Sequence, residues 1–225
     1  MKRSEMNQAI RDMEKKIEEC CFKLPPFCSF GPEQWEELGE EYAEVKDNML
    51  GWDVTDFGSG DFQRIGFAAL TLRNGNVRMP ERYPKTYAEK LLYMKPGQKL
   101  PMHFHWNKME DIINRGGGNL LIRVYQATEE DGLSEEDVPV SSDGRNYSVP
   151  AGTRVRLRPG ESISLYPRTY HEFIVEEGTG DILLGEVSMC NDDENDNRFL
   201  TAGGRFSRIE EDEPPYRLLC NEYPD

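Results

Sequence analysis

The pattern of apolar and polar positions changes once along the chain, near residue 50. Before that point, between residues 4 and 21, apolar residues recur at spacings of three and four, which predicts a helix with one apolar face. These residues are Met6, Ile10, Met13 and Ile17. Two prolines at 25–26 end this helix. A second helical segment is expected to begin at Pro32, because proline is tolerated in a first helical turn and the following glutamates suit the positive end of the helix dipole. We therefore expect a helical N-terminal extension over residues 1–50.

From residue 60 onward, short runs rich in Phe, Thr, Val, Ile and Leu are separated by Gly, Pro and Asn, a pattern typical of strands and turns. The runs expected to be strands are "FAALTLR", "YAEKLLYM", "KLPMHFHW", "GNLLIRVY", "TRVRLRPG", "SISLYP", "HEFIVEE" and "DILLGEVS". Many short strands with regular turns predict a mainly β sandwich or small barrel over residues 60–225. The chain has no internal repeat and no long linker, so we expect a single domain over residues 1–225.

Three polar segments are expected to form the turns and loops of this barrel. The Asn-Gly pair at residues 74–75 predicts a turn after the first strand. The glycines of "NRGGGN", at residues 114–119, are expected to form a tight turn. The acidic, Ser-rich segment at residues 126–149 is expected to be a solvated excursion between strands, with a turn at 143–144.

The charge of the chain narrows its choice of partners. Its 225 residues carry 42 acidic and 27 basic side chains, with a pI near 4.7, so the averaged field repels nucleic acid. No apolar run approaches the roughly 20 residues of a membrane-spanning helix, and the first residues lack the apolar core of a signal peptide. The five cysteines, an odd number without C-x-x-C spacing, fit reduced thiols. We therefore expect a cytoplasmic protein that binds neither nucleic acid nor membranes.

The three histidines of the chain are the first candidates for chemistry. His103 and His105 lie two residues apart on an expected strand, so their imidazoles point to the same side and can bind one ion. Glu110 is expected just past the strand end, where the chain can curl back and add a carboxylate oxygen. His171 lies in a later expected strand, which a folded barrel can bring opposite the pair. An H-x-H pair is common outside metal sites, but the four candidate ligands together predict a metal site.

Three imidazoles and one carboxylate form a borderline nitrogen and oxygen ligand set. Zinc would complete a tetrahedron with them and leave no open position. An ion that prefers six ligands, such as Mn²⁺, Fe²⁺ or Co²⁺, would leave two adjacent positions open. Two such positions suit a substrate with oxygens on neighbouring carbons, and the ligand set alone does not choose among these ions.

The spacing of these ligands resembles a known pattern. Residues 97–117 read G-x5-H-x-H-x4-E-x6-G, which is similar to the first motif of the cupin superfamily. The second cupin motif is matched more loosely, from Gly160 to His171, and Val175 stands where that motif has asparagine. The resemblance implies a cupin barrel, also called a double-stranded β-helix, with the histidine of the second motif as a metal ligand.

Beyond this superfamily, the chain resembles the D-lyxose isomerases, which are bacterial cupin sugar isomerases. The resemblance runs from the first helix to the last ten residues. It is carried by "LPPF", "LGWDVT", "YAEK", "PMHFHW", "KMEDIINRGGGNL", "PGESISL", "GEVS", "NDDENDN" and "DEPPYRLLCNEY". It implies manganese as the metal, a monosaccharide as the substrate, and interconversion of D-lyxose with D-xylulose and of D-mannose with D-fructose through an enediol.

Such an isomerisation needs a base that removes the proton from C2 and an acid that helps the oxygens exchange theirs. Lys90 can donate to a substrate oxygen, unless it lies on an outward face. Glu186 lies within an apolar strand, where burial would raise its pKa towards that of a useful base; alternatively, it is a structural partner for an arginine. Asp193 and Glu213 lie in acidic runs that can accept hydrogen bonds from sugar hydroxyls at the barrel rim or form solvated loops. The same runs contain Asp192, Asp196 and Asp212.

Two other classes of protein share these features. An iron-dependent cupin dioxygenase binds ferrous iron with the same ligand types, although acidic rim residues suit a polyol better than an apolar substrate. A non-catalytic sugar-binding cupin has less need of a complete ligand set, and turnover would exclude it. Cupins often pair through sheet edges or strand exchange, so we also expect a homodimer.

Overall fold

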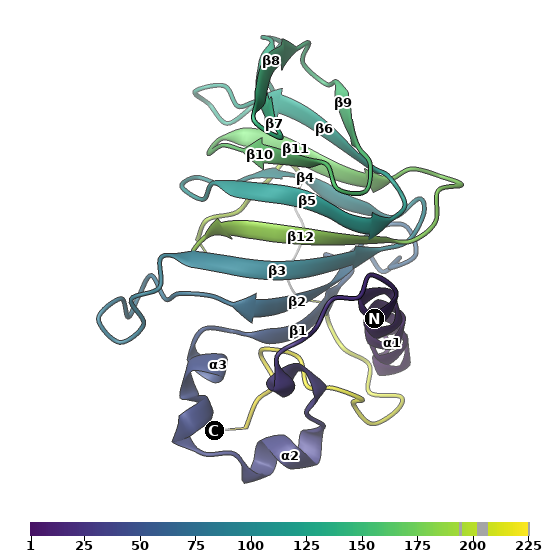
Figure 1. Cartoon of the computed structure of the whole chain (residues 1–225), viewed down its shortest axis with the longest axis vertical. Coiled ribbons are helices and arrows are strands. Elements are labelled where there is room, and N and C mark those ends of the chain that lie inside the picture. The colour runs from purple at the N-terminus through teal and green to yellow at the C-terminus, as the bar shows by residue number, and fades with distance from the viewer. Residues whose placement is uncertain (194, 202–206, 225) are drawn as a thin grey trace.

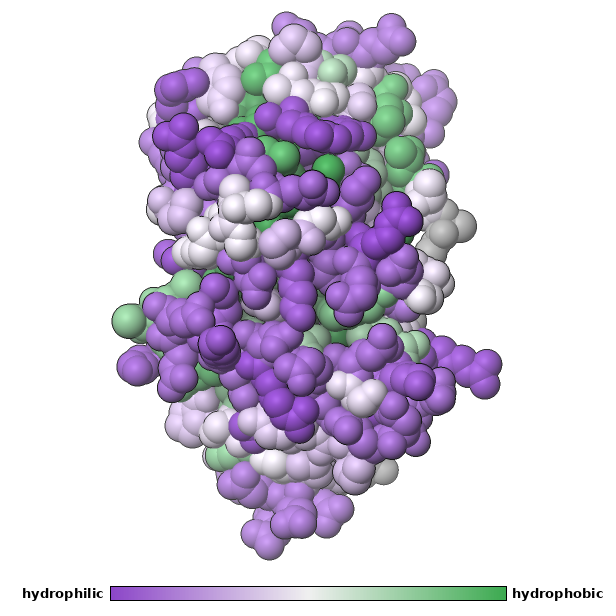
Figure 2. Space-filling view, turned by 90° about the vertical axis from the view of Figure 1, so that its right-hand side faces the viewer, coloured by the Kyte–Doolittle hydropathy of each residue, from purple (hydrophilic) through white to green (hydrophobic). Residues whose placement is uncertain are grey.

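The computed structural model consists of two antiparallel β-sheets, with helices gathered at one end of the molecule (Figure 1). It describes residues 1–193, 195–201 and 207–224. On the face drawn in Figure 2, hydrophilic side chains cover most of the surface, as the acidic composition leads one to expect. Within the described ranges, no helix is both long enough and apolar enough to cross a membrane.

The described part of the chain forms strands that pair into a larger and a smaller sheet. The strands are β1 (Gly51–Thr55), β2 (Phe67–Arg73), β3 (Tyr87–Met94), β4 (Lys99–Phe104), β5 (Glu110–Gly117), β6 (Leu120–Gln126), β7 (Val138–Ser142), β8 (Arg145–Val149), β9 (Arg154–Leu157), β10 (Ser162–Leu165), β11 (Thr169–Val175), β12 (Ile182–Met189) and β13 (Arg198–Phe199). The eight-stranded sheet has the order β1-β2-β3-β12-β5-β10-β7-β8, and the five-stranded sheet has the order β13-β4-β11-β6-β9. Side chains from both sheets, such as Ile112 and Phe173, share one core. The prediction of a mainly β barrel is confirmed.

Strands β3 and β12 are buried on both faces of the larger sheet. In β3, Leu92 points into the core between the sheets, whereas Leu91 points outward to the helix α1 (Arg3–Glu19). In β12, Leu184 likewise points into the core between the sheets, and Leu183 points outward to α1. Because both faces are covered, these strands have nearly continuous apolar runs instead of alternating apolar and polar residues.

The predicted N-terminal extension is present, but its second half is more broken than expected. After α1 come η1 (Pro26–Ser29), α2 (Pro32–Glu37), η2 (Glu40–Tyr42) and α3 (Ala43–Asp47). The helix that begins at Pro32 ends after six residues, where Leu38 adopts an extended backbone. The first strand begins at Gly51, so strands start earlier than the expected residue 60. The C-terminal segment returns to this end of the molecule, where buried Arg3 forms ion pairs with Glu211 and Glu222.

Three expectations about loops were wrong in part. The segment 126–149 contains the hairpin β7–β8, and Val138 and Val140 are buried in the core; its turn at 143–144 is confirmed by the positive φ angles of both residues. The Asn-Gly pair at 74–75 does not join two paired strands directly, because β3 begins only at Tyr87. Most of "NRGGGN" continues β5 instead of forming a tight turn. Polar composition concealed these strands, since they alternate apolar and polar residues or contain glycine.

Substitutions at two glycines distinguish the cost of backbone strain from the cost of a steric clash. Gly117 has φ +90, and a Cβ there would lie 2.0 Å from the carbonyl oxygen of Asp181, whereas Gly144 has φ +79 with open space around it. We predict that Gly144→Ala lowers the free energy of unfolding by about 1 kcal/mol, through backbone strain alone. Gly117→Ala should lower it by about 3 kcal/mol or more, because β5 must also move away from Asp181. Urea unfolding measures both losses in the free energy of unfolding. Equal losses for the two variants would contradict a steric cost at Gly117.

Candidate active site

The fold brings the four sequence-predicted metal ligands to one place between the sheets. His103 on β4 is the register partner of His171 on β11, and their Nε2 atoms lie 3.1 Å apart. His105 follows β4 directly. Glu110 does not curl back from the end of β4, as the sequence suggested, but is the first residue of β5 in the opposite sheet. Its Oε1 lies 3.2 Å from His171 Nε2, and its Oε2 lies 3.5 Å from His105 Nε2.

Hydrogen bonds to the backbone fix the proton on each imidazole. Each Nδ1 lies 2.9 to 3.0 Å from a carbonyl oxygen: that of Pro101 for His103, that of Asp196 for His105 and that of Thr169 for His171. A carbonyl oxygen only accepts, so each Nδ1 donates, and each Nε2 of a neutral ring carries a lone pair. Two facing lone pairs repel each other unless a cation lies between them. The three buried histidines, whose ligand atoms all lie within 4.8 Å of one another, therefore fit a metal ion.

The charge states of these ligands also suit a cation. Burial, together with the neighbouring His171 and His105, holds the pKa of His103 well below its usual range, so this imidazole is neutral. Burial alone would raise the pKa of Glu110, but the Lys108 ammonium and the His105 imidazole hold it well below its usual range, so this carboxyl is ionised. Neutral imidazole and ionised carboxylate are the forms that bind metals.

Lys90 and Glu186 face the same pocket from adjacent strands. They are register partners on β3 and β12, and Lys90 Nζ lies 3.3 Å from Glu186 Oε1. Burial would raise the pKa of Glu186, but Lys108 and Lys90 lower it below its usual range. The prediction of a raised pKa was therefore wrong, because the sequence did not show that two ammonium groups surround this carboxylate.

Lys108 is the main site residue that the sequence analysis missed. Its side chain is buried, and its Nζ lies 2.8 Å from Glu110 Oε2, 3.0 Å from Glu186 Oε1 and 3.3 Å from Asn191 Oδ1. Burial lowers the pKa of Lys108, but the two carboxylates outweigh this effect and raise it above its usual range. Its position two residues before the expected ligand Glu110 was the available signal. Asn191, which also accepts from Lys90 at 2.6 Å, was missed as well.

The acidic runs divide between the pocket and the surface. Asp192 and Asp193 line the pocket. Asp196 supports the loop between β4 and β5, because its carboxylate accepts hydrogen bonds from the backbone N–H groups of Asn107 and Lys108, both at 2.8 Å. Glu213 lies outside the pocket.

The positions of Glu213 and Asp212 correct the interpretation of the second acidic run. Both side chains are exposed. The Asn7 side chain donates to Glu213 at 2.6 Å, and the backbone and side chain of Ser4 both donate to Asp212. Neither residue is among those that line the pocket. Their carboxylates hold the C-terminal segment against α1, a pairing between chain ends that composition alone does not reveal.

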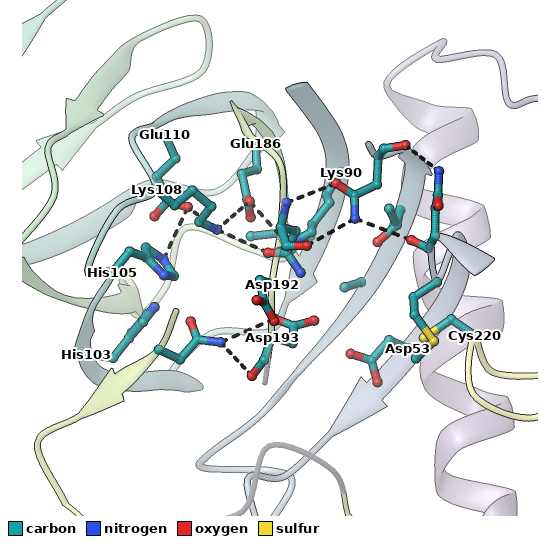
Figure 3. A pocket seen from close by; sticks show the side chains of 18 of the residues that line it. Asp53, Lys90, His103, His105, Lys108, Glu110, Glu186, Asp192, Asp193 and Cys220 are labelled. Atoms are coloured by element: carbon teal, nitrogen blue, oxygen red, sulfur yellow. Dashed lines mark hydrogen bonds and ion pairs between the residues drawn. The ribbon is translucent and has the colours of Figure 1, made fainter. Parts of the chain in front are cut away.

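The pocket has a volume of about 210 Å³. Figure 3 shows His103 and His105 at one side of it, Glu186 and Lys90 near its centre, and Asp53 and Cys220 at the other side. Its lining therefore combines a metal site, a carboxylate beside two lysines, and further groups that can bond to hydroxyls. Such a pocket suits a small, polar substrate with several hydroxyl groups.

Comparison with solved structures defines the class of fold. The L-ribose isomerase of Cellulomonas parahominis superposes with a TM-score of 0.62 at 17% identity, covering 93% of this chain and 98% of that one. The L-ribose isomerase of Geodermatophilus obscurus gives a TM-score of 0.60 at 16% identity, with the same coverage. The chain thus shares the fold of these proteins, in agreement with the cupin barrel that the sequence motif implied.

Comparison of sequences defines the family. The model of the D-lyxose isomerase family matches residues 1–223. The D-lyxose/D-mannose isomerase of Serratia proteamaculans is 51% identical, covering 99% of this chain and 98% of that protein. The protein of the same name from Escherichia coli O157:H7 is 47% identical, with the same coverage. The chain is a sugar isomerase and belongs to the D-lyxose isomerase family.

Burial of His103, which lowers the pKa of this imidazole, predicts a pH dependence of stability for the metal-free protein. The folded pKa of His103 lies below its ordinary value of 6.5, so below that pH the unfolded chain binds a proton that the folded chain excludes. The free energy of unfolding should therefore fall as the pH drops from about 7 to about 5. Urea unfolding of chelator-treated protein checks this, and His103→Asn should weaken the dependence. Equal stability of the unsubstituted protein at both pH values would contradict the prediction.

Proposed function

We propose that this protein is a metal-dependent aldose-ketose isomerase that interconverts D-lyxose with D-xylulose and D-mannose with D-fructose. The observation that carries the proposal is one pocket whose lining combines three buried histidines with the Glu186 carboxylate, which is paired with two lysines. The names of relatives at about half identity over nearly their whole length support the choice of sugars. In our proposal, the carbon skeleton passes through an enediol that both sugars of each pair share.

The proposed ligands of the metal are His103, His105, Glu110 and His171. An ion that accepts nitrogen and oxygen ligands and prefers six of them leaves room for substrate oxygens. Among such ions we propose Mn²⁺, because the resemblance to the D-lyxose isomerases implies manganese. When bound, such an ion polarises the C1 and C2 oxygens and stabilises the negative charge that develops as the enediol forms.

Glu186 is the residue that we propose moves the proton between C2 and C1. Its hydrogen bonds and ion pairs with described residues all end on Oε1, from Lys90, Lys108 and Ser188, which leaves Oε2 available to the substrate. The low pKa of Glu186 keeps this oxygen ionised. In our proposal, Oε2 takes the proton from C2 and returns it to C1, while a hydroxyl proton passes from O2 to O1.

Lys90 and Asp193 are proposed to hold the substrate during this transfer. Lys90 Nζ has two acceptors among the described residues, Asn191 Oδ1 and Glu186 Oε1, so a third N–H is available for a sugar oxygen. Asp193 lines the pocket, where its carboxylate can accept hydrogen bonds from hydroxyl groups. Glu213 has no part in this proposal because of its position at the surface.

The proposed function predicts activity that depends on metal. Protein stripped of metal should form no ketose from D-lyxose or D-mannose, and addition of Mn²⁺ should restore ketose formation. His103→Ala should remain inactive with Mn²⁺, because one ligand is lost. Ketose is measured by a colorimetric assay, with an oxygen electrode as a control for dioxygenase activity. Bound Mn²⁺ without any ketose would overturn the proposal.

The role of Glu186 predicts a large effect from a single atom change. Glu186→Gln keeps the shape of the side chain but cannot accept the C2 proton, so kcat should fall about 10²- to 10⁴-fold. Binding of Mn²⁺, measured by titration, should stay within a few-fold of the parent value. Glu213→Gln is the matched control at the surface and should retain parental kcat. A Glu186→Gln variant with kcat within tenfold of the parent value would exclude this residue as the base.

A homodimer in the cytoplasm is a further part of the proposal. Tyr87, Val187 and Met189 are 50%, 42% and 51% exposed, and they lie together on the outer face of β3 and β12, where Tyr87 is the register partner of Met189. Exposed apolar side chains that gather in this way mark interaction surfaces.

The proposed cytoplasmic location is supported by the cysteines. All five are free thiols, which is consistent with a reducing compartment.

Light scattering of the full chain tests the homodimer. The measured mass should be twice that of the 25.9 kDa chain, and Met189→Lys should lower it if the outer face of β12 forms the interface. A parental protein with the mass of one chain at micromolar concentration would contradict the proposed dimer.

A further inference from the structure

Two buried lysines reach the pocket, but their ammonium groups differ in the number of acceptors around them. Lys108 Nζ has three: Glu110 Oε2 at 2.8 Å, Glu186 Oε1 at 3.0 Å and Asn191 Oδ1 at 3.3 Å. An ammonium has three N–H donors, so Lys108 is saturated. Lys90 has two acceptors among the described residues and keeps one donor for a ligand. Lys108 is therefore not placed to donate to a substrate, although it is charged and lines the same pocket.

Lys108 contacts one oxygen of each of two carboxylates, so the other oxygen of each is available to another partner. In Glu110, Oε2 lies 3.5 Å from His105 Nε2 but accepts from Lys108 at 2.8 Å, whereas Oε1 has no contact with Lys108 and lies 3.2 Å from His171 Nε2. In Glu186, Oε1 accepts from Lys108, and no hydrogen bond from a described residue ends on Oε2. One ammonium thus orients both the ligand carboxylate and the carboxylate that acts as the base.

The backbone beside Lys108 is anchored so that this orientation is maintained. The Lys108 N–H donates to Asp196 Oδ2 at 2.8 Å, and the carbonyl oxygen of Asp196 accepts from His105 Nδ1 at 3.0 Å. The Lys108 side chain is only 3% exposed, so water screens its charge little. The lysine, one imidazole and the loop between β4 and β5 therefore form one connected unit.

We propose that Lys108 is a positioning residue that reserves Glu110 Oε1 for the metal ion and Glu186 Oε2 for the substrate. The inference rests on the proposed function, since it takes His103, His105, Glu110 and His171 as the ligands. A carboxylate that gave both oxygens to the ion would fill a position that one of the two sugar oxygens needs. By holding Oε2 of Glu110, Lys108 keeps that position open.

The first test uses the full chain loaded with Mn²⁺ alone, without sugar, and counts exchangeable waters on the bound ion by water-proton relaxation. In Lys108→Met, the second oxygen of Glu110 is free to join the ion. We expect this variant to bind Mn²⁺ within about tenfold of the parent affinity but with about one exchangeable water fewer. Glu186→Gln is the matched control: it changes another partner of Lys108 and leaves the Lys108–Glu110 pair, so its water count should equal that of the parent.

The second readout is the split between kcat and KM for D-lyxose. Lys108→Met should lower kcat/KM about 10- to 100-fold, with a raised KM, because a substrate oxygen must displace the second oxygen of Glu110. Glu186→Gln should lower kcat without this rise in KM. A role of Lys108 in overall stability alone would change neither the water count nor KM in the folded fraction.

Each outcome bears on a separate claim. A Lys108→Met protein with the parental water count, or one that no longer binds Mn²⁺, would overturn the inference. If this variant does not fold, Lys108→Gln replaces it; its shorter, neutral side chain does not hold both carboxylates, and the same loss of water is expected. A parent protein that binds Mn²⁺ but converts no sugar would contradict the proposed function and leave the relaxation comparison valid. A parent protein that binds no Mn²⁺ would overturn both.

Discussion

The rest of the site depends on one constraint: buried negative and positive side chains must alternate. These side chains are Glu110, Lys108, Glu186 and Lys90. Each is less than 10% exposed, and burying a single unpaired charge is prohibitively costly. Opposite signs at 2.8 to 3.3 Å offset this cost. Removing one member leaves a partner uncompensated, which costs about 3–5 kcal/mol, a large share of the roughly 5–15 kcal/mol that stabilises a folded protein. The groups proposed for catalysis are therefore also groups whose pairing the fold requires.

The register of the larger sheet is what brings these charges together. Lys90 is opposite Glu186 across β3 and β12, and Glu110 is opposite Ser188 across β12 and β5. A slip by one residue would turn every side chain of a strand to the other face and place the charges under α1. The apolar contacts of Leu91 and Leu183 with α1 hold the outer face. Thus α1, which does not line the pocket, stabilises the register that the pocket needs.

Features with a local physical cause were predictable from the sequence. The period of 3.6 residues in α1 and the short apolar runs of β3, β4 and β12 are properties of one segment each, so these elements were recognised from their own residues. For the same reason, His103 and His105 could be placed on one side of a strand. Glu110 and His171 were proposed as further ligands from their residue types and expected positions, and the family resemblance supported them, because the spacing of residues within each motif is also local. Boundaries were wrong where glycines lie within a strand, as in β5, or where acidic residues precede one, as in β7.

By itself, then, the sequence determined the class of fold, the family and the four residues, His103, His105, Glu110 and His171, that the fold brings together. Only the tertiary structure decided that Lys108 lies between Glu110 and Glu186, that the pKa of Glu186 is lowered and that Glu213 belongs to the surface beside α1. The physical reason is that ion pairing and burial depend on distances in space between strands far apart in the chain. A lysine on a loop and a carboxylate 78 residues later have no relation in a linear pattern, yet their 3.0 Å separation sets the charge of the proposed base.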